Sequence, residues 1–477
     1  MKSVSLKNPI MRSWLADAGF RLDAPPFLSR SVEIQKLLLK ANLPKQPLES
    51  LTAGHDGGIF NGPIFSRVYV DDPTFGVRFL SSSDMLRADL SGLLFLRKTD
   101  AESPKLAFLR LEEGSTLISC SGTIGKMAYT RADMTDIWSS QHIMKVVPDT
   151  DRILSGYLYA FLSSEFGNAL ITGETYGSII QSIEPRHISR LPVPRLGETL
   201  EKSVHSLICE ASRKLSSYQK LINAATAKIF QLSGLSDPSR QQWHEDPSDL
   251  GFSVHSRGLI GLRAWNLSRR VQHLRDQITA GVWSSIGEVV DEEWLKWRVM
   301  FKRIDVEPEH GIEVITQRPL FHLFPEGRWL SRAYLLNLSP RYLVPDQTIL
   351  VAKQGTLGED ELYCQSEFIT GARALNRAYS DHCMRLVVKK KAIDPGYLFA
   401  FLRSETGFRL LRALSEGAKQ QDIHWRTIPH LPIPRLTSRD ELTIGNMTRE
   451  AYTHKNEAIE LILKARNVVE TQIGANR

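Results

Sequence analysis

Residues 156–196 read GYLYAFLSSEFGNALITGETYGSIIQSIEPRHISRLPVPRL, and residues 396–436 read GYLFAFLRSETGFRLLRALSEGAKQQDIHWRTIPHLPIPRL. The two stretches align without a gap at an offset of 240 residues, and about half of their positions are identical. A period this long excludes a solenoid repeat, whose units are far shorter. The chain is therefore expected to contain two copies of a whole domain.

The repeat continues on both sides of this stretch. The further matching pairs are LISCSGTIG (117–125) with LVAKQGTLG (350–358), HIMK (142–145) with HCMR (382–385), and FSRV (65–68) with FKRI (301–304). Downstream, each copy runs into a long polar segment with helical periodicity. The sequence therefore predicts the order domain, helix, domain, helix.

Short β-type runs separated by Gly, Pro, Asp and Ser fill the centre of each copy, as in residues 65–147. Helices are expected over residues 14–18, 31–41 and 157–166. Residues 191–196 are expected to be extended because their two prolines exclude a helix. The predicted fold class is α+β, with two tandem repeated domains, each followed by a long α-helix.

Apolar residues after the first copy recur at alternating steps of four and three, which is the seam of a coiled coil. They are Val204, Ile208, Ala211, Leu215, Tyr218, Ile222, Ala225, Ile229 and Leu232. The second copy keeps this register with Ile444, Ala451, Ala458, Ile462, Ala465 and Val469, although Thr448 and Lys455 weaken it. We expect the two helices to pair as an antiparallel coiled coil, or to bury this face against another subunit.

These patterns divide the chain into five segments. They are a first domain (1–197), a first helix (198–234), a Pro-, Ser- and Gly-rich linker (235–250), a second domain (251–436) and a second helix (437–477).

The composition is that of a protein expected in the cytoplasm. The chain has 477 residues and four cysteines without CxxC spacing, and it contains neither the apolar core of a signal peptide nor a run long enough to span a bilayer. The net charge is +7, and the positive excess lies in the two repeated domains. This distribution favours an acidic partner bound by the domains, while an ordinary solvated surface remains the alternative.

Taken together, the repeated motifs resemble those of the specificity subunits of type I restriction-modification systems. The marks of this resemblance are the (Ser/Gln)-Gly-Thr-(Ile/Leu)-Gly turns at 121–125 and 354–358, the Gly-Tyr-Leu-(Tyr/Phe)-Ala-Phe-Leu helices, the Gly-x-x-x-Gln-x-Ile loops at 177–183 and 417–423, and the Leu-Pro-(Val/Ile)-Pro-Arg-Leu exits. Residues 21–24 also match the usual opening of the first domain, whereas residues 263–266 match it less well in the second. The resemblance covers essentially the whole chain.

The resemblance implies a DNA-binding subunit that is not itself an enzyme. Each target-recognition domain would read one half of a bipartite site on double-stranded DNA, and the helices would set the spacing and dock two methyltransferase subunits. Restriction or translocase subunits would join that complex. By the same implication the chain needs no cofactor, because S-adenosylmethionine and ATP would belong to the partner subunits.

The sequence contains no recognisable catalytic or metal-binding motif, as expected of a subunit that is not itself an enzyme. Residues 122–126 lack the spacing of a phosphate-binding P-loop, and a tight turn is the better interpretation. Neither a GxSxG nor an HExxH motif occurs. The acidic cluster at 291–293 is interpreted as a solvated helix face, and His142 and His382 as structural histidines within strands. We therefore predict no catalytic residue and no metal site.

The candidate DNA-contacting residues lie in the repeated loops and beside the repeated turns, because Arg, Lys, Gln and Asn match base edges and phosphates. They are Arg67, Lys126, Gly177, Ser178, Gln181, Arg303, Lys353, Gly417, Lys419 and Gln421. A surface loop without a ligand is the alternative for each of them. Since Gln181 and Gln421 are common to both copies, they are expected to hold a loop or a phosphate rather than to distinguish two sequences.

Two other functions remain open from the sequence. One is a specificity subunit of a type II or phage-exclusion methyltransferase system, which could use the same architecture. The other is a nuclease with a duplicated fold. DNA binding measured with and without methyltransferase subunits would separate these classes.

Overall fold

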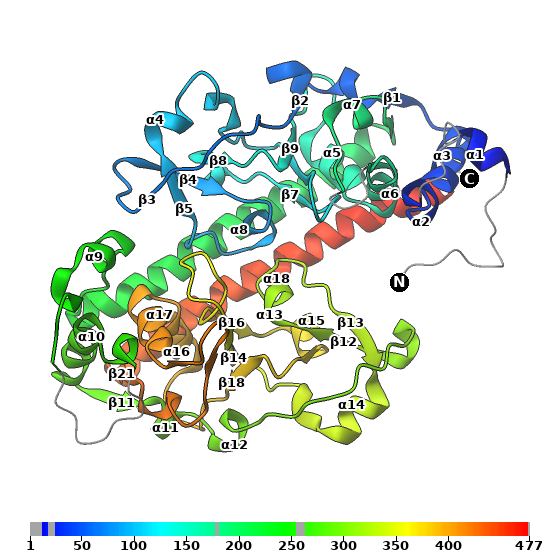
Figure 1. The fold of residues 1–477 in the computed structure, drawn as a ribbon. Coiled ribbons are helices and arrows are strands. Elements are labelled where there is room, and N and C mark those ends of the chain that lie inside the picture. The colour runs from blue at the N-terminus through cyan, green and yellow to red at the C-terminus, as the bar shows by residue number, and fades with distance from the viewer. Residues whose placement is uncertain (1–11, 18–23, 177–180, 254–262, 476–477) are drawn as a thin grey trace. The chain divides into compact units, whose positions relative to one another are not determined.

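The computed structural model describes residues 12–17, 24–176, 181–253 and 263–475 (Figure 1). The chain divides into two compact units, one formed by residues 1–87, 93–216 and 457–477, the other by residues 88–92 and 217–456. Each unit thus combines most of one repeat copy with part of both long helices. Both units mix helices with strands, which confirms the α+β class.

The first unit contains short helices and strands followed by the start of a long helix. Its elements are α1 (Arg12–Asp17), α2 (Pro25–Leu28), α3 (Ser31–Lys40), β1 (Lys45–Pro47), β2 (Ile59–Phe60), β3 (Tyr69–Val70), β4 (Gly76–Leu80), β5 (Leu94–Arg97), α4 (Lys98–Ala101), β6 (Thr116–Ser119), β7 (Met127–Tyr129), β8 (Ile137–Ser139), β9 (Ile143–Val146), α5 (Ser155–Leu162), α6 (Glu165–Gly173), α7 (Pro185–Ile188), β10 (Pro192–Pro194) and α8 (Glu198–Ser233). The strands form two four-stranded sheets, β2-β9-β6-β7 and β3-β5-β4-β8, and the two-stranded β1-β10 sheet.

The second unit repeats this plan with smaller sheets. Its elements are α9 (Arg240–Glu245), α10 (Arg269–Thr279), β11 (Trp283–Ser285), α11 (Ile286–Val289), α12 (Glu292–Leu295), β12 (Gly311–Ile315), α13 (Gln317–Leu320), β13 (Arg328–Ser331), α14 (Arg332–Leu338), β14 (Thr348–Ala352), β15 (Gln354–Gly355), β16 (Ser366–Ile369), α15 (Ala372–Leu375), β17 (Ala378–Tyr379), β18 (Cys383–Leu386), α16 (Pro395–Leu402), α17 (Glu405–Arg412), β19 (Ser415–Glu416), β20 (Gln421–Ile423), β21 (Pro432–Pro434) and α18 (Ser438–Ala475). Its sheets have the orders β13-β12-β17, β16-β14-β18, β15-β20-β19 and β11-β21.

The central helix of each unit is buried on all sides. Every residue from Gly156 to Leu162 in α5, and every one from Gly396 to Leu402 in α16, is buried. A helix that is apolar all round belongs inside a core rather than on its surface. These helices are therefore the packing centres on which the strands of each unit assemble.

The single helix expected over residues 157–166 is two helices. Ser164 interrupts it and caps α6, since its side-chain oxygen accepts a hydrogen bond from the Gly167 amide at 3.3 Å. Ser404 caps α17 in the same way, with a bond of 3.0 Å from the Gly407 amide. Serine satisfies an otherwise unpaired amide at a helix N-terminus, and its occurrence in both copies was the signal for this break.

The Leu-Pro-x-Pro-Arg-Leu exits are extended, as the sequence predicts. β10 pairs with β1 and β21 pairs with β11, both antiparallel. The Tyr157 hydroxyl donates to the Pro194 carbonyl, and the Tyr397 hydroxyl donates to the Pro434 carbonyl at 2.7 Å. The arginine of each exit then forms an ion pair of 2.7 Å with a glutamate in the first turn of the following helix, Arg195 with Glu201 and Arg435 with Glu441. We call this arrangement the exit clamp.

The long helices α8 and α18 bury the predicted apolar stripe. They contain 36 and 38 residues and are drawn in green and red in Figure 1. Buried residues include Val204, Ile208, Leu215, Tyr218, Ile222, Ile229, Ile444, Ile462 and Val469. Leu232 is instead 43% exposed, because the helix ends one residue later and Phe230 takes the last buried position.

Contacts between the two long helices occur within each unit. In the first unit, the Lys214 ammonium lies 2.7 Å from the Glu457 carboxylate. In the second, the rings of Tyr218 and Tyr452 meet edge to face with centroids 5.6 Å apart. Each ring supplies a large apolar surface at the position where the two helices meet.

The two polar residues that weaken the second stripe are buried with partners. Thr448 donates to the Gly396 carbonyl at 3.0 Å, and the Lys455 ammonium lies 2.7 Å from the Glu367 carboxylate. A buried polar group is tolerated when it is hydrogen-bonded or paired. Thr448 and Lys455 thus join α18 to the domain that precedes it.

Two segments differ from their sequence interpretation. The predicted linker at 235–250 is folded in part, since helix α9 lies in it. Trp243 is buried there, with the guanidiniums of Arg270 and Arg409 at 4.7 and 4.9 Å from the ring centroid. Residues 88–92 belong to the second unit although they precede β5 of the first. Asp89 pairs there with Arg403 at 2.7 Å.

Candidate nucleic-acid interface

The repeated turn and the repeated loop of the first copy lie side by side. The Gly122 amide donates to the Gln181 carbonyl at 3.0 Å, and the Ile183 amide donates to the Cys120 carbonyl at 3.0 Å. Gly122 and Gly125 have φ angles of 77° and 80°, which favour glycine. Residues 122–126 thus form the tight turn that the sequence predicts.

The second copy joins its equivalent segments by strand pairing. β15 pairs antiparallel with β20, so that Gly355 faces Gln421, and the Ile423 amide donates to the Lys353 carbonyl at 3.0 Å. Gly417 has a φ of 101°, and a Cβ there would lie 2.4 Å from the Gln420 carbonyl oxygen. The turn and the loop that were singled out from the sequence are therefore in contact with each other in each unit.

The candidate residues differ in how they meet solvent. Gln181 and Lys419 are exposed, and Lys126 is half-buried. Gly177 and Ser178 lie outside the described residues. Gly417 is exposed at the start of the bend that Lys419 shares.

Lys353 and Gln421 lie below the surface. Burial lowers the pKa of Lys353, which is 6% exposed, and the nearby carboxylates of Asp422 and Asp381 oppose that shift. The Gln421 side chain accepts from the Arg263 guanidinium at 2.8 Å and donates to the Ala418 carbonyl. Gln421 therefore holds its own loop, the role expected of a residue that both copies share.

The opening of the second domain contributes to the same loop. Arg263 and Asn266 both donate to the Ser415 carbonyl, at 2.9 and 3.0 Å, and the Trp265 indole donates to the Arg412 carbonyl at 3.2 Å. These bonds fix the end of α17 against residues 263–266. The less regular Arg-Ala-Trp-Asn sequence thus has a definite structural role that its motif match did not reveal.

The two arginines at matching positions have different environments. Arg67 is half-buried, donates to the Gln141 side chain at 2.9 Å and lies 5.4 Å from the centroid of the Phe79 ring. Arg303 is exposed. Equal sequence positions therefore give a structural guanidinium in one unit and a solvent-facing one in the other.

The matching histidines stand at the starts of strands β9 and β18 rather than within them. Their carbonyls accept equivalent bonds, from Cys120 to His142 at 3.0 Å and from Lys353 to His382 at 3.1 Å. Burial, and then the charge of Arg67, lowers the pKa of His142. The His382 ring contacts the Gln354 side chain, but it is 48% exposed, so the structure does not bury this histidine as the sequence interpretation expects.

Each copy also buries a cation three residues after its histidine. Lys145 is 2% exposed, and burial lowers its pKa to about 7. The Lys145 ammonium donates to one carbonyl, that of Ile143 at 3.4 Å. The equally buried Arg385 donates to the carbonyls of Arg341, Tyr379, Ser380 and Cys383, and its guanidinium lies 3.8 Å from the centroid of the Trp297 ring. Sequence alone gave no reason to bury either side chain.

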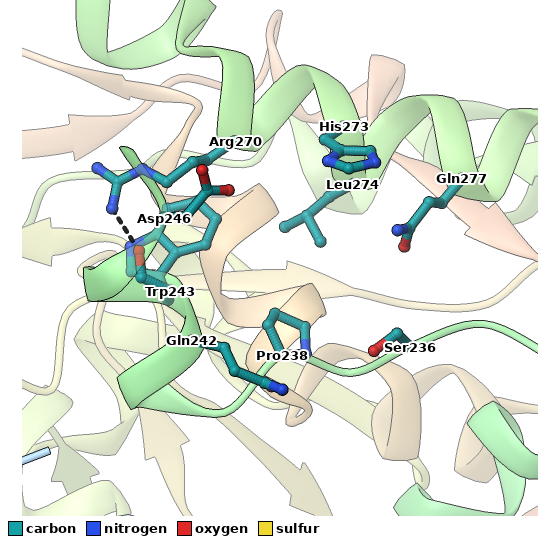
Figure 2. Close-up of a pocket in the computed structure, with 9 residues that line it drawn as sticks. All are labelled: Ser236, Pro238, Gln242, Trp243, Asp246, Arg270, His273, Leu274 and Gln277. Carbon is teal, nitrogen blue, oxygen red and sulfur yellow. Dashed lines mark hydrogen bonds between the residues drawn. The ribbon is translucent and has the colours of Figure 1, made fainter. Parts of the chain in front are cut away.

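A pocket of about 220 Å³ lies outside these loops (Figure 2). It is lined by Ser236, Pro238, Gln242, Trp243, Asp246, Arg270, His273, Leu274 and Gln277. The Arg270 guanidinium donates to the Trp243 carbonyl at 2.5 Å, which fixes α9 against α10. None of the predicted DNA-contacting residues that the structure describes lines it.

The acidic cluster at 291–293 caps a helix. The Asp291 side chain accepts from the amides of Glu293 and Trp294, at 2.9 and 3.3 Å, and Glu292 and Glu293 are exposed in the first turn of α12. Acidic residues stabilise this end of a helix. Within the described ranges, no group of three or more His, Cys, Asp and Glu side chains is arranged to hold a metal ion.

The comparisons with known proteins give structural matches. No family model matches the chain, and no curated protein matches it. Three solved structures match over 91% of this chain. They belong to type I restriction-modification systems. The first, described as the S subunit from M. genitalium, has a TM-score of 0.36 and 9% identity, with 95% of its chain covered.

The other two matches are similar. One is the HsdS subunit from Thermoanaerobacter tengcongensis, with a TM-score of 0.28, 10% identity and 97% of that chain covered. The other comes from work on complex assembly and conformational transition of the type I system, with a TM-score of 0.27, 11% identity and 98% covered. At these scores the likeness to the solved structures carries no functional argument. The argument about function rests on the residues of this chain. No helix among the described residues is long and apolar enough to cross a membrane.

Proposed function

We propose that the chain is a sequence-specific DNA-binding subunit without catalytic activity of its own, in which each repeated domain reads one half of a bipartite site. The observation that carries this proposal is the duplication itself. Both copies keep the same exit clamp and the same serine cap, and both place a turn and a loop side by side. A framework used twice, with different exposed residues on it, suits the recognition of two different short sequences.

The two long helices would act as the spacer. The contacts of residue 214 with residue 457 and of residue 218 with residue 452 run in opposite directions along the two helices, which supports pairing as an antiparallel coiled coil. A helix of 36 residues is about 54 Å long. This length is enough to hold two half-sites about one turn of DNA, roughly 34 Å, apart.

The partners belong to the same proposal. A specificity subunit that cannot modify DNA needs methyltransferase subunits, and we propose that two of them bind this chain together with restriction or translocase subunits. S-adenosylmethionine and ATP would be bound by those partners. The motifs shared with type I specificity subunits support this assignment in preference to a free-standing nuclease.

The test is a selection of duplexes from a random pool by the full chain, with and without a methyltransferase subunit. We expect two short motifs separated by a fixed unspecified gap. Incubation of the chain alone with the selected duplex should leave it uncut and unmethylated. A single continuous motif, no enrichment, or cleavage that is lost on substitution in this chain would contradict the proposal.

A further inference from the structure

Residues 297–302, between α12 and β12 of the second unit, have side chains that alternate between inward and outward. Trp297, Val299 and Phe301 pack against the core formed around Ile312, Leu330 and Tyr342, whereas Arg298, Met300 and Lys302 are exposed. Alternation with a period of two is the pattern of an extended strand. The outward face of this segment therefore presents two cationic side chains with the methionine thioether between them.

The inward face fixes the segment in place. The Trp297 indole donates to the Ser339 hydroxyl at 2.9 Å, and the Tyr342 hydroxyl donates to the Val299 carbonyl at 2.8 Å. The Tyr342 ring also meets the rings of Trp297 and Phe301 edge to face, at centroid distances of 4.9 and 5.4 Å. The three outward side chains are thus displayed from a rigid backbone.

Met300 is the most exposed apolar side chain of this segment. Its side chain is 80% exposed, and Ile64, which occupies the matching position in the first copy, is 88% exposed. Both copies thus expose a large apolar side chain at the same point of the repeat. In the first copy Gly62 and Ser66 occupy the positions of Arg298 and Lys302, so the cations are specific to the second unit.

The spacing of the two cations fits double-stranded DNA. Four residues of extended chain span about 13 Å, close to the ~12 Å width of the major groove. Arg298 and Lys302 can therefore face the phosphates on the two rims while Met300, halfway between them, faces the base edges. The acidic neighbour Asp305 is paired with Arg328 at 2.7 Å, which reduces its effect on an approaching phosphate.

We propose that Met300 contacts the C5-methyl group of a thymine in the half-site bound by the second unit, with Arg298 and Lys302 on the flanking phosphates. The proposal rests on the proposed DNA-binding function. The thymine methyl is the apolar group that the major groove presents, and apolar side chains recognise it. A phosphate-flanked apolar contact of this kind reads one base while the cations supply sequence-independent affinity.

The test uses the full chain and the duplex that it selects from a random pool. Each thymine is replaced in turn by deoxyuridine, which removes only the methyl group. The unsubstituted chain should lose affinity about fourfold at one thymine, the effect of burying one methyl group. Met300→Ala should bind the thymine and uracil duplexes equally at that position, and Ile64→Ala should keep the discrimination of the unsubstituted chain there.

The cations are tested by the salt dependence of binding. Arg298→Ala with Lys302→Ala should reduce the slope of log affinity against log salt by about 1.8. The matched control, Arg269→Ala with Lys390→Ala, removes the same two charges from exposed positions of the same unit and should leave the slope unchanged. Equal melting temperatures would show that every variant is folded.

Several results would overturn the inference. If the chain selects a bipartite sequence but Met300→Ala still discriminates thymine from uracil as the unsubstituted chain does, this inference is contradicted and the proposed function is not. Unchanged DNA affinity accompanied by lost methyltransferase binding would also contradict this inference alone, and would assign the segment to a protein partner. No enriched sequence at all would contradict the proposed function and this inference together.

Discussion

The two units share their framework and differ in the residues placed on it. In both, a tyrosine of the central helix bonds the exit strand, an arginine pairs with the next helix, and a serine caps the helix after the central one. The loops differ, with Gln181 exposed in one unit and Gln421 buried in the other. The shared residues of the exit clamp and the serine caps therefore stabilise both domains, whereas even a glutamine common to both loops differs in its exposure to solvent. Under the proposed function, recognition is assigned to the exposed residues that differ between the copies.

The largest expected effect tests whether both units use the helix stripe equally. Leu215→Asp in the first unit and Ile222→Asp in the second each place a carboxylate at a buried position, 5% and 0% exposed. We expect each to lower the free energy of unfolding by at least about 4 kcal/mol. Denaturant unfolding of each variant measures this change in the free energy of unfolding.

Leu232→Asp is the matched control because that leucine lies on the same helix and is 43% exposed. It should change stability by no more than about 0.5 kcal/mol. Equal effects of all three substitutions would mean that the stripe is not a packing surface.

The second prediction concerns the buried cations. Folding lowers the pKa of Lys145 to about 7 through burial, so between pH 7 and about 10 the unfolded chain binds a proton that the folded chain does not. Stability should therefore rise with pH across this window and be lowest, on this account, below pH 7. Lys145→Met should stabilise the chain by a few kcal/mol at pH 6 and by progressively less as the pH approaches 10.

Arg385→Met, the equivalent substitution in the second unit, should destabilise the chain, whereas Lys145→Met should stabilise it. Arg385→Met removes the donor to four backbone carbonyls and should cost about 3 kcal/mol at every pH in that range. Unfolding curves of both variants at several pH values make the comparison. A pH-independent loss of stability in Lys145→Met would show that its ammonium is compensated in the folded state.

The third and smallest effect tests the exit clamp. Tyr157→Phe and Tyr397→Phe each remove a buried hydroxyl and leave a proline carbonyl without its donor, at a cost of about 2 kcal/mol. The two losses should agree because the clamp is the same in both units. Tyr69→Phe, at a residue 42% exposed, is the control and should be nearly neutral. Clearly unequal losses of stability in Tyr157→Phe and Tyr397→Phe would show that the exit clamp does not contribute equally in the two units.

Much of the framework could be predicted from the sequence because its signals are local. Proline excluded helix at the exits, and the steps of three and four marked the buried face of both long helices. The break at Ser164 was missed because the apolar pattern resumes at Phe166 after only three polar residues, although the serine occurs in both copies. Burial of Trp243 in the predicted linker depends on Arg270 and Arg409, which are distant in sequence.

The candidate interface was predicted less completely for the same reason. The turn and the loop were both selected, and their contact follows from pairing between distant strands. Which side chains reach the surface was not predictable, as Lys353 and Lys419 illustrate, because burial is decided by neighbours from other elements. The outward face of residues 298–302 was overlooked because only Phe301 and Lys302 lie in the repeated FSRV/FKRI motif, and which side chains of so short a segment face solvent depends on the core beneath it.

The central claim, that two reading domains are held at a fixed spacing by the helices, is tested most directly by lengthening both helices where they pass from one unit to the other. Seven residues would be inserted after Ser216 in α8 and after Asn456 in α18, which keeps the seam in register. The insertion adds about 10 Å of helix, or roughly three base pairs. Duplex selection by the lengthened chain should return both motifs unchanged with a gap longer by about that number. A changed motif, or both motifs with the original gap, would contradict the account.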